Sequence, residues 1–312
     1  MSDVRDPLAE ASEAVSGRYR VRVLEPSPPA IDEGPFFADD PTRHEGPGDL
    51  PIVSPIGNGD LTWSEMAAGD EGLSKFAADR WLGAHKRLLP MPAGFNESLA
   101  AMHQLAQHVV APARYLANGK IGLRYTQSGF GTPFFAVDRQ VRMQGTKLIL
   151  QSGDKALEAE ITNLADLRQF LSVQEDLPFP GPARWDLERP LTLVDTHTDF
   201  LGDLFGFATS VLEEWRYQRT NEEPSRLQIW PEHFDAATDL GPSGQRANYG
   251  ASPGDELHPL PYFYVGPWEH RSGSIWNEPS FGGASLSYSD LVAASDQRAA
   301  ALEFFEKYRR AL

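Results

Sequence analysis

The apolar residues between positions 201 and 215 recur at the spacing of one helix face, and this segment limits the fold more than any other part of the chain. Seven residues make up the series, at intervals of 3, 1, 3, 3, 1 and 3: Leu201, Leu204, Phe205, Ala208, Val211, Leu212 and Trp215. Short β-like runs lie on both sides of it, at 191–198 and 226–230. A long amphipathic helix among short strands favours an α+β fold in which antiparallel sheets pack against helices.

The first half of the chain has its own helix followed by strands. The helix carries apolar residues from Leu99 to Leu116, and we expect Asn96 to cap it and Pro112 to kink it. A short helix capped by Asn163 ends this half, and the β-like runs before it are at 120–126, 130–137, 140–143, 147–151 and 157–161.

The second half repeats this order, starting from the 201–215 helix, which Asp199 would cap. A helix from about Ser295 closes the chain, and the β-like runs before it are at 226–230, 234–238, 262–265, 272–276 and 284–288. We therefore predict a pseudo-repeat of two α-β-α halves, whose sheets either pool or pack back to back.

Proline interrupts the beginning of the chain. Residues 1–60 hold nine of the 25 prolines, which rule out long regular elements there. We expect residues 1–62 to form an extended, irregular and acidic arm. A first α+β half at 63–175, beginning with a helical pattern at 63–89, and a second half at 176–312 would follow it.

Composition excludes several classes of function. The 312 residues include no cysteine, which removes disulfides, thiolate nucleophiles and cysteine zinc sites. The formal charge is -16, and such an acidic field repels nucleic acid and anionic membranes, so we expect neither as a partner. Without an apolar membrane span or an apolar N-terminal signal, a soluble cytoplasmic protein is expected.

Aromatic, imidazole and carboxylate side chains concentrate between residues 227 and 268, around two β-like runs. Alternation along the second run places Tyr262 and Tyr264 on one face, where they could form the floor of a ligand pocket. We predict a small-molecule site here, with His233 as general acid/base and Asp235 as the residue that orients it. The predicted binding residues are Trp230, Tyr262, Tyr264, Arg124 and Asp255.

Histidines suggest a divalent metal as the cofactor. His197, His233 and His258 could meet with a carboxylate around zinc or iron. In Asp195-Thr-His197-Thr-Asp199, an extended strand would place the three potential ligands on one side. The alternative is that these histidines are ordinary turn and surface residues.

Two other motifs carry no chemistry. Gly250-Ala-Ser252-Pro-Gly254 matches the nucleophile elbow Gly-x-Ser-x-Gly, but Pro253 lacks the N–H that would form the oxyanion hole. We expect a turn instead, with Gly254 at positive φ. The glycine-rich pieces match no phosphate-binding loop, so no nucleotide cofactor is expected.

Two motifs in the same order resemble the hallmarks of an uncharacterised bacterial family, a domain of unknown function found mainly in actinobacteria. The first is Gly-Lys-Ile-Gly-Leu-Arg at 119–124, and the second is Trp-Pro-Glu-His-Phe-Asp at 230–235, followed by Gly-Ala-Ser-Pro-Gly-Asp and Pro-Tyr-Phe-Tyr. The resemblance covers residues 95–312 and departs from the family after residue 126. It implies the architecture and assigns no activity.

Two classes of function remain open. The first is a small-molecule-binding domain or metal-assisted enzyme centred on the 227–268 block. The second is a non-catalytic structural or protein-interaction module that forms homo-oligomers, in which the block supplies turns.

Overall fold

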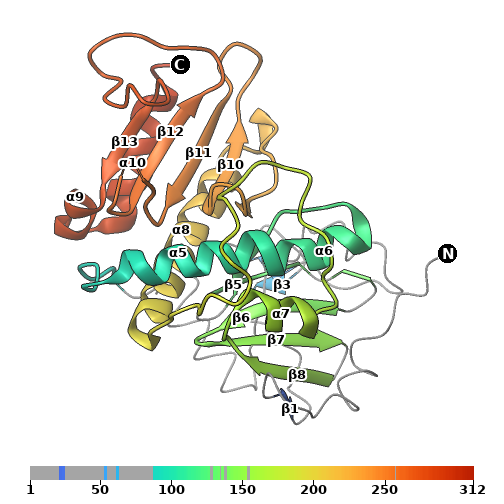
Figure 1. Cartoon of the computed structure of the whole chain (residues 1–312). Coiled ribbons are helices and arrows are strands. Elements are labelled where there is room, and N and C mark those ends of the chain that lie inside the picture. The colour runs from blue at the N-terminus through green and yellow to red at the C-terminus, as the bar shows by residue number, and fades with distance from the viewer. Residues whose placement is uncertain are drawn as a thin grey trace.

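The computed structural model describes residues 21–24, 53–54, 61–62 and 87–312, apart from 127–128, 134, 137–138, 153–154 and 257. The predicted arm and the predicted helix at 63–89 lie almost entirely outside the described residues. Two antiparallel sheets and the helices around them form an α+β fold, as the sequence predicts (Figure 1). A pair of two-residue strands, β2 (Val53–Ser54) and β3 (Leu61–Thr62), makes a third, small sheet.

Each half of the chain forms a sheet in which neighbouring strands, apart from one added edge strand, are consecutive in sequence. In the first sheet the order is β1-β8-β7-β6-β5-β4, so β1 (Val21–Leu24) adds to the far edge. The other strands of this sheet are β4 (Arg124–Thr126), β5 (Gly129–Gly131), β6 (Arg139–Gln144), β7 (Lys147–Ser152) and β8 (Lys155–Glu160). The second sheet runs through β9 (Gln228–Trp230), β10 (Asp235–Leu240), β11 (Ala247–Ser252), β12 (Tyr262–Pro267) and β13 (Ala284–Ser287).

The two sheets meet at the first strand of each meander. Leu123 and Ile229 form an antiparallel bridge in which each backbone N–H donates to the other residue's carbonyl, at 2.8 Å both ways. Both sheets therefore join edge to edge through β4 and β9. The predicted α+β fold with antiparallel sheets is confirmed, and this single bridge links the edges of two otherwise separate sheets.

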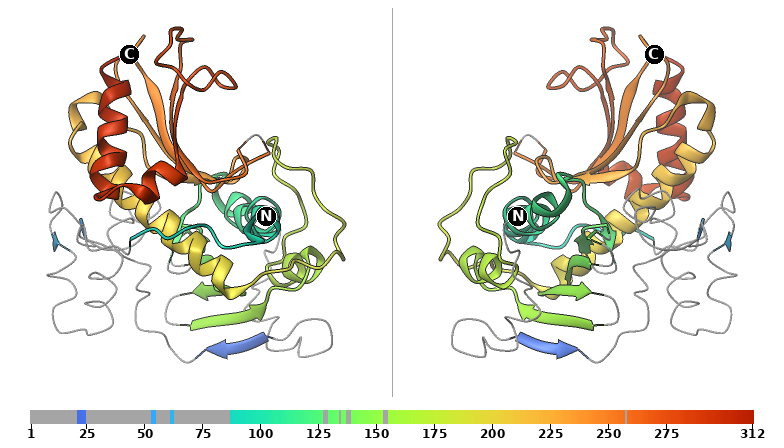
Figure 2. Two further views of the ribbon diagram at one scale, coloured as in Figure 1. Left: turned by 90° about the vertical axis from the view of Figure 1, so that its left-hand side faces the viewer. Right: turned by 90° about the vertical axis from the view of Figure 1, so that its right-hand side faces the viewer.

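Helices connect and cover the sheets. α5 (Phe95–Leu105), the π-helical segment η3 (Ala106–Val110) and α6 (Ala111–Asn118) form one continuous rod between them. α8 (Asp195–Tyr217) packs against strands of both sheets, and Figure 2 shows it passing from one to the other. The remaining helical segments are α7 (Leu164–Phe170), η4 (Thr220–Glu222), α9 (Tyr288–Ala293) and α10 (Gln297–Arg309).

Aromatic rings fill the space between the second sheet and its helices. Trp215 of α8 lies 5.2 Å from the Tyr249 ring and 5.5 Å from the Phe305 ring of α10, between ring centroids. Phe263 packs on Phe305 from β12. One face of this sheet is thus core, and we call the opposite face the outer face.

The helices test two of the predicted caps and the predicted kink. Asn163 caps α7 as predicted, because its side chain accepts the N–H of Asp166. The Asn96 cap is wrong, since α5 begins at Phe95 after Gly94, whose φ is +79°. The rod departs from α-helical geometry at η3, directly before the predicted kink at Pro112, where the proline has no N–H to continue the ladder.

The strand predicted at 191–198 is also wrong in its second part. α8 begins at Asp195, so Asp195, His197 and Asp199 lie on a helix and do not share one side as they would on a strand. Asp199 is consequently inside the helix and is not its cap. The β-branched residues here favour a strand locally, but the long apolar face that follows extends the helix through them.

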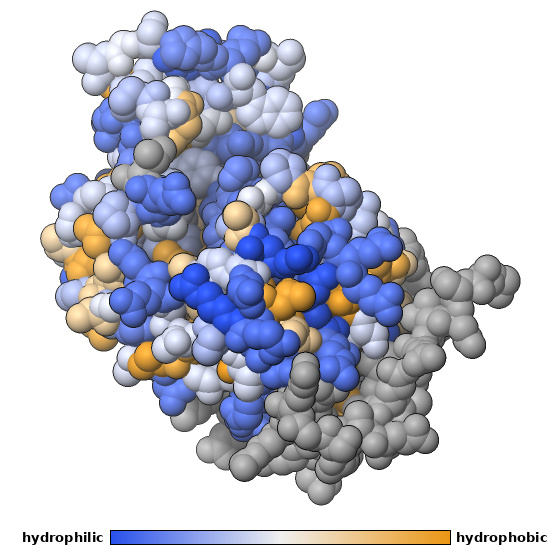
Figure 3. Space-filling model, viewed as in Figure 1, coloured by the Kyte–Doolittle hydropathy of each residue, from blue (hydrophilic) through white to orange (hydrophobic). Residues whose placement is uncertain are grey.

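The second sheet contains a strand that the sequence did not predict. β11 is its central strand, whereas the predicted strand at 272–276 lies in a loop. In the described part of the chain, no helix is long and apolar enough to cross a membrane. The face in Figure 3 is mainly hydrophilic, with its apolar side chains scattered.

Candidate functional site

The outer face of the second sheet brings together most of the predicted binding residues. Phe263 and Val265 point to the core, and Tyr262 and Tyr264 to the outer face, which confirms the alternation predicted for this strand. Gly250 of β11 pairs with Tyr264. A Cβ at Gly250 would lie only 2.5 Å from Cζ of Tyr264, so the tyrosine ring lies directly across this glycine.

Tyr264 reaches across β11 to Asp235, the first residue of β10. The Tyr264 hydroxyl donates a hydrogen bond to Asp235 Oδ2. Asp235 is only 7 % exposed, and its Oδ1 atom has no hydrogen-bond partner within the described part of the chain. Burial raises the pKa of Asp235, against the opposing effects of the Tyr264 hydrogen bond and the nearby His233. Burial also raises the pKa of Tyr264, and Asp235 adds to this shift.

A second polar chain continues from Tyr262 toward the edge of the sheet. The Tyr262 hydroxyl donates to Asp255 Oδ2 at 2.7 Å, and the His258 backbone N–H donates to Asp255 Oδ1 at 2.7 Å. His258 Nε2 lies 3.1 Å from Oε2 of the buried Glu278, and its ring lies 4.8 Å from that of Tyr262. Burial, followed by Asp255, raises the pKa of Tyr262. Titratable side chains therefore line this face from β10 to the loop before β13.

The Gly250-Ala-Ser252-Pro-Gly254 segment forms the end of β11 and the turn after it. Gly254 has a φ of +116°, as predicted, and its N–H donates to the Ser252 hydroxyl at 3.1 Å. Asp255 closes the turn, because its backbone N–H donates to the His258 carbonyl at 2.8 Å. This segment orients Asp255 toward Tyr262, so its role is to shape the site.

The turn between β9 and β10 holds Asp235 in place through Phe234. Phe234 has a φ of +55°, which is uncommon for a residue with a side chain, and is 1 % exposed. Its ring contacts one ring each from α5, β5 and α8. The distances between ring centroids are 5.2 Å to His103, 5.0 Å to Phe130 and 5.5 Å to Phe205. The strained turn is thus fixed by packing on α5, β5 and α8.

His103 is a part of this site that the sequence analysis missed. Its ring stacks on Phe234 with an angle of 13° between planes, and its Nε2 atom lies 2.9 Å from the Pro231 carbonyl oxygen. The carbonyl can only accept, so Nε2 carries the hydrogen. Burial lowers the pKa of His103 to about 4. His103, Gln104, Gln107 and His108 form a polar stripe on an apolar helix, and that stripe was the signal available in the sequence.

We expect the protein to lose stability on acidification because of His103. Its pKa falls from 6.5 when unfolded to about 4 when folded, so the folded state binds fewer protons between these values. The contribution of neutral His103 to the free energy of unfolding is complete above pH 6.5 and is lost as the pH falls toward 4. The free energy of unfolding should fall by about 3 kcal/mol in total over this range. Urea unfolding from pH 7 to pH 4.5 measures this loss.

His103→Gln keeps a donor for the Pro231 carbonyl and should show a much weaker dependence on pH over this range. His270→Gln removes an exposed histidine and serves as the matched control, which should retain the wild-type dependence. If the free energy of unfolding depended equally on pH in His103→Gln and in the wild type, His103 would not be the cause of the acid sensitivity.

The structure places some of the predicted site residues beside Asp235 and Tyr262, but it places Arg124 elsewhere. Trp230 pairs with Asp235 in the sheet, and His233 lies exposed beside it. Arg124 is buried on β4, where it lines a small cavity with Thr209 and Glu213 of α8. Because three strands separate β4 from β12 in the joined sheet, the structure does not bring Arg124 to the tyrosines.

The three predicted metal ligands lie in separate surroundings. His197 uses both ring nitrogens locally, with Nδ1 at 2.8 Å from the Ser98 hydroxyl and Nε2 at 3.0 Å from the Ala93 carbonyl. His258 lies between Asp255 and Glu278, and His233 is exposed on the turn before β10. In the described residues, no three histidine, aspartate or glutamate side chains are placed to hold a metal ion.

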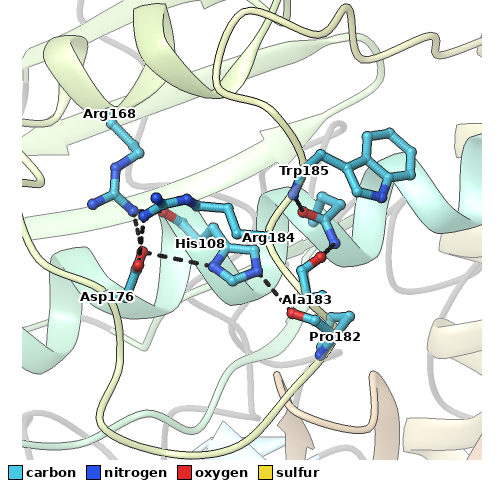
Figure 4. A network of polar contacts seen from close by, with 8 residues as sticks. His108, Arg168, Asp176, Pro182, Ala183, Arg184 and Trp185 are labelled. Atoms are coloured by element: carbon cyan, nitrogen blue, oxygen red, sulfur yellow. Dashed lines mark hydrogen bonds and ion pairs between the residues drawn. The ribbon is translucent and has the colours of Figure 1, made fainter.

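A long loop is fastened along the helical rod by a separate polar network. This strap, residues 173–194, lies across α5 and η3 (Figure 4). Gln104 binds it twice, donating to the Ala183 carbonyl and accepting from the Trp185 N–H, both at 2.9 Å. His108 Nε2 lies 3.1 Å from the Pro182 carbonyl oxygen. These contacts explain why polar side chains are buried on this helix.

Asp176 anchors the beginning of the strap. Its carboxylate accepts from Arg168 at 2.7 Å and from Arg184 at 2.5 Å, and these two arginines lower its pKa against the effect of burial. Arg168 also donates to the His108 carbonyl at 2.9 Å. The hydrogen bonds of this network hold the loop on the helical rod, which favours a structural function for it.

Compared with protein-family models, curated proteins and solved structures, this chain matches none.

Proposed function

We propose that this protein is a small-molecule-binding domain whose site is the outer face of the second sheet. Asp235, Tyr262 and Tyr264 would form the floor of the site, and Trp230 and His233 would border it. Asp255 would hold the Tyr262 hydroxyl in place. Membership of the family suggested by the two sequence motifs is part of this proposal.

One observation carries the proposal: Asp235 is a buried carboxyl group with one oxygen bonded to Tyr264 and the other without a partner in the described residues. A buried polar atom left unpaired destabilises a protein by about 1–3 kcal/mol. Each such atom needs an explanation, and for Asp235 we propose a bound molecule as the missing partner. His233, exposed and next to Asp235, could exchange protons with a bound molecule.

Exposed apolar residues support the second candidate, a protein-interaction module. Four of them lie in the loops on either side of β12: Leu260 (49 % exposed), Trp268 (61 %), Ile275 (42 %) and Phe281 (38 %). Phe281 also contacts the Tyr264 ring at 5.9 Å. The two candidates thus share one region, and the experiment has to separate them.

Amide NMR spectra of the full-length protein, titrated with a library of neutral, cationic and anionic fragments, test the first candidate. We expect bound fragments to shift the amide signals of β10, β11 and β12. Tyr264→Phe removes the hydroxyl beside Asp235 and should weaken this binding about tenfold.

Tyr288→Phe is the matched control, since Tyr288 is also buried and its hydroxyl donates to the Leu89 carbonyl, away from this face. It should bind the fragments as the wild type does. Fragments that shift only signals elsewhere would contradict the proposal. A dimer in sedimentation velocity that Trp268→Ser dissociates would then favour the interaction module.

A further inference from the structure

A groove lies between the end of α8 and the second half of α10, and we call it the α8–α10 groove. The two helices lie side by side on the core side of the second sheet, so the groove is separated by that sheet from the outer face (Figure 2). Its volume is about 690 Å³, within the range of about 300–1,000 Å³ found for small-molecule sites. Its charged lining residues are Arg219, Lys307 and Arg310 on one side of the balance and Glu303 and Glu306 on the other.

Arg219 is fixed in position in this groove. Its guanidinium carbon lies 3.2 Å from the centroid of the Trp215 ring, and Trp215 is itself 1 % exposed and packed into the core. Nη1 donates to the Gln218 amide oxygen at 3.2 Å, and Nη2 donates to Glu306. The Arg219 side chain is only 14 % exposed, so the positive charge is already in place before a ligand binds.

Glu306 is one carboxylate shared by two arginines. Its Oε2 atom accepts from Arg219, and its Oε1 atom accepts from Nε of Arg310 at 2.6 Å. Against the effect of burial, these two arginines lower the pKa of Glu306, so this residue is ionised at neutral pH. In the described part of the chain, the Arg310 side chain bonds only Glu306, and it is 77 % exposed. Both of its terminal nitrogens can therefore bind a ligand.

The charges of the groove leave a positive excess. Three cationic and two anionic side chains line it, which gives +1, although the whole chain carries -16. Lys307 and Glu303 are one turn apart on α10 and offset each other, so the excess belongs to the two arginines that share Glu306. Arg309, the next residue, differs from them because it has Glu222 as its own partner at 2.6 Å.

We propose that the α8–α10 groove binds a small aromatic carboxylate. The terminal nitrogens of Arg310 match the two oxygens of a carboxylate, and a single negative charge neutralises the excess of the groove. The aromatic ring would lie against the half-buried Leu302 and the aliphatic stem of Lys307, which also line the groove. This site is separate from the outer face and does not rest on the function proposed above.

Benzoate, benzamide and benzylammonium share an aromatic ring and differ in charge, so they test the proposal in NMR titrations of the full-length protein. Benzoate should shift the indole N–H signal of Trp215 and the amide signals of α8 and α10. It should bind at least about tenfold more tightly than the other two probes, and added salt should weaken its binding. Equal binding of the three probes, or no benzoate shift at this groove, would overturn the proposal.

Two variants should change benzoate binding in opposite directions. Arg310→Gln removes a charge from an exposed side chain and should weaken binding about tenfold. Glu306→Gln removes the carboxylate that competes for both arginines and should tighten binding by about threefold or more. Arg309→Gln is the matched control, because it makes the same change of charge one residue away, and it should bind within about twofold of the wild type. Weaker binding in Glu306→Gln, or equal losses in the two arginine variants, would contradict the proposal.

The same titrations separate this site from the proposed function. Benzoate shifts in α8 and α10, in a protein whose β10, β11 and β12 signals respond to no fragment, would support the groove and contradict the function proposed for the outer face. Shifts confined to β10, β11 and β12 would do the reverse.

Discussion

Phe234→Ala is expected to lower the free energy of unfolding by about 3–5 kcal/mol, the largest effect of any single substitution considered. The ring is 1 % exposed and contacts His103, Phe130 and Phe205, so its removal leaves a cavity where both sheets and two helices meet. It also releases the turn that positions Asp235. Urea unfolding at pH 7 measures the loss.

Phe179→Ala is the control for the loss of a phenylalanine ring, since Phe179 is 44 % exposed, and it should change stability by less than about 1 kcal/mol. If Phe234→Ala does not fold, Phe234→Leu keeps most of the volume and should reduce stability by about 1–2 kcal/mol. Similar values for the Phe234 and Phe179 variants would show that the turn is not held by this ring.

Gly250→Ala is expected to lower stability by about 2–4 kcal/mol, although it adds a single methyl group. The new Cβ would lie 2.5 Å from the Tyr264 ring, which must move and give up its hydrogen bond to Asp235. The buried carboxyl group would then have no side-chain donor. The variant should also lose fragment binding at the outer face.

Gly266→Ala provides a close control. Gly266 is on the neighbouring strand β12, and the nearest atom to its added Cβ would be 3.9 Å away, in ordinary contact. Its stability should change by less than about 0.5 kcal/mol. Adding Tyr264→Ala to Gly250→Ala removes the clash. The loss of stability in the double variant should therefore be much smaller than the sum of the losses in the two single variants. Additive effects would contradict the steric explanation.

The sequence predicted those parts of the site that depend on local chemistry. Alternation along β12 separates the outward tyrosines from Phe263 and Val265, and the absence of an N–H at Pro253 excludes the nucleophile elbow. Asn163 caps α7 for an equally local reason. In each case one short segment contains all the information.

The rest depends on partners that are distant in the sequence. β11 is built from alanine, asparagine, glycine and serine around one tyrosine, which have low strand preference, and it is a strand because β10 and β12 pair with it on both sides. Gly250 is required there only because of Tyr264. His103 belongs to the site through Pro231 and Phe234, more than a hundred residues later. No local pattern contains those contacts.

The position of α8 has a consequence for how the chain folds. Each sheet is a meander of neighbouring strands, so most of its pairings are local and can form early. α8 precedes the second meander in sequence, yet it also packs against β4 and β5 of the first. Neither half can complete its core without this one helix. The halves should therefore unfold in a single cooperative transition, and a chain cut between them would leave the first half with an exposed apolar surface.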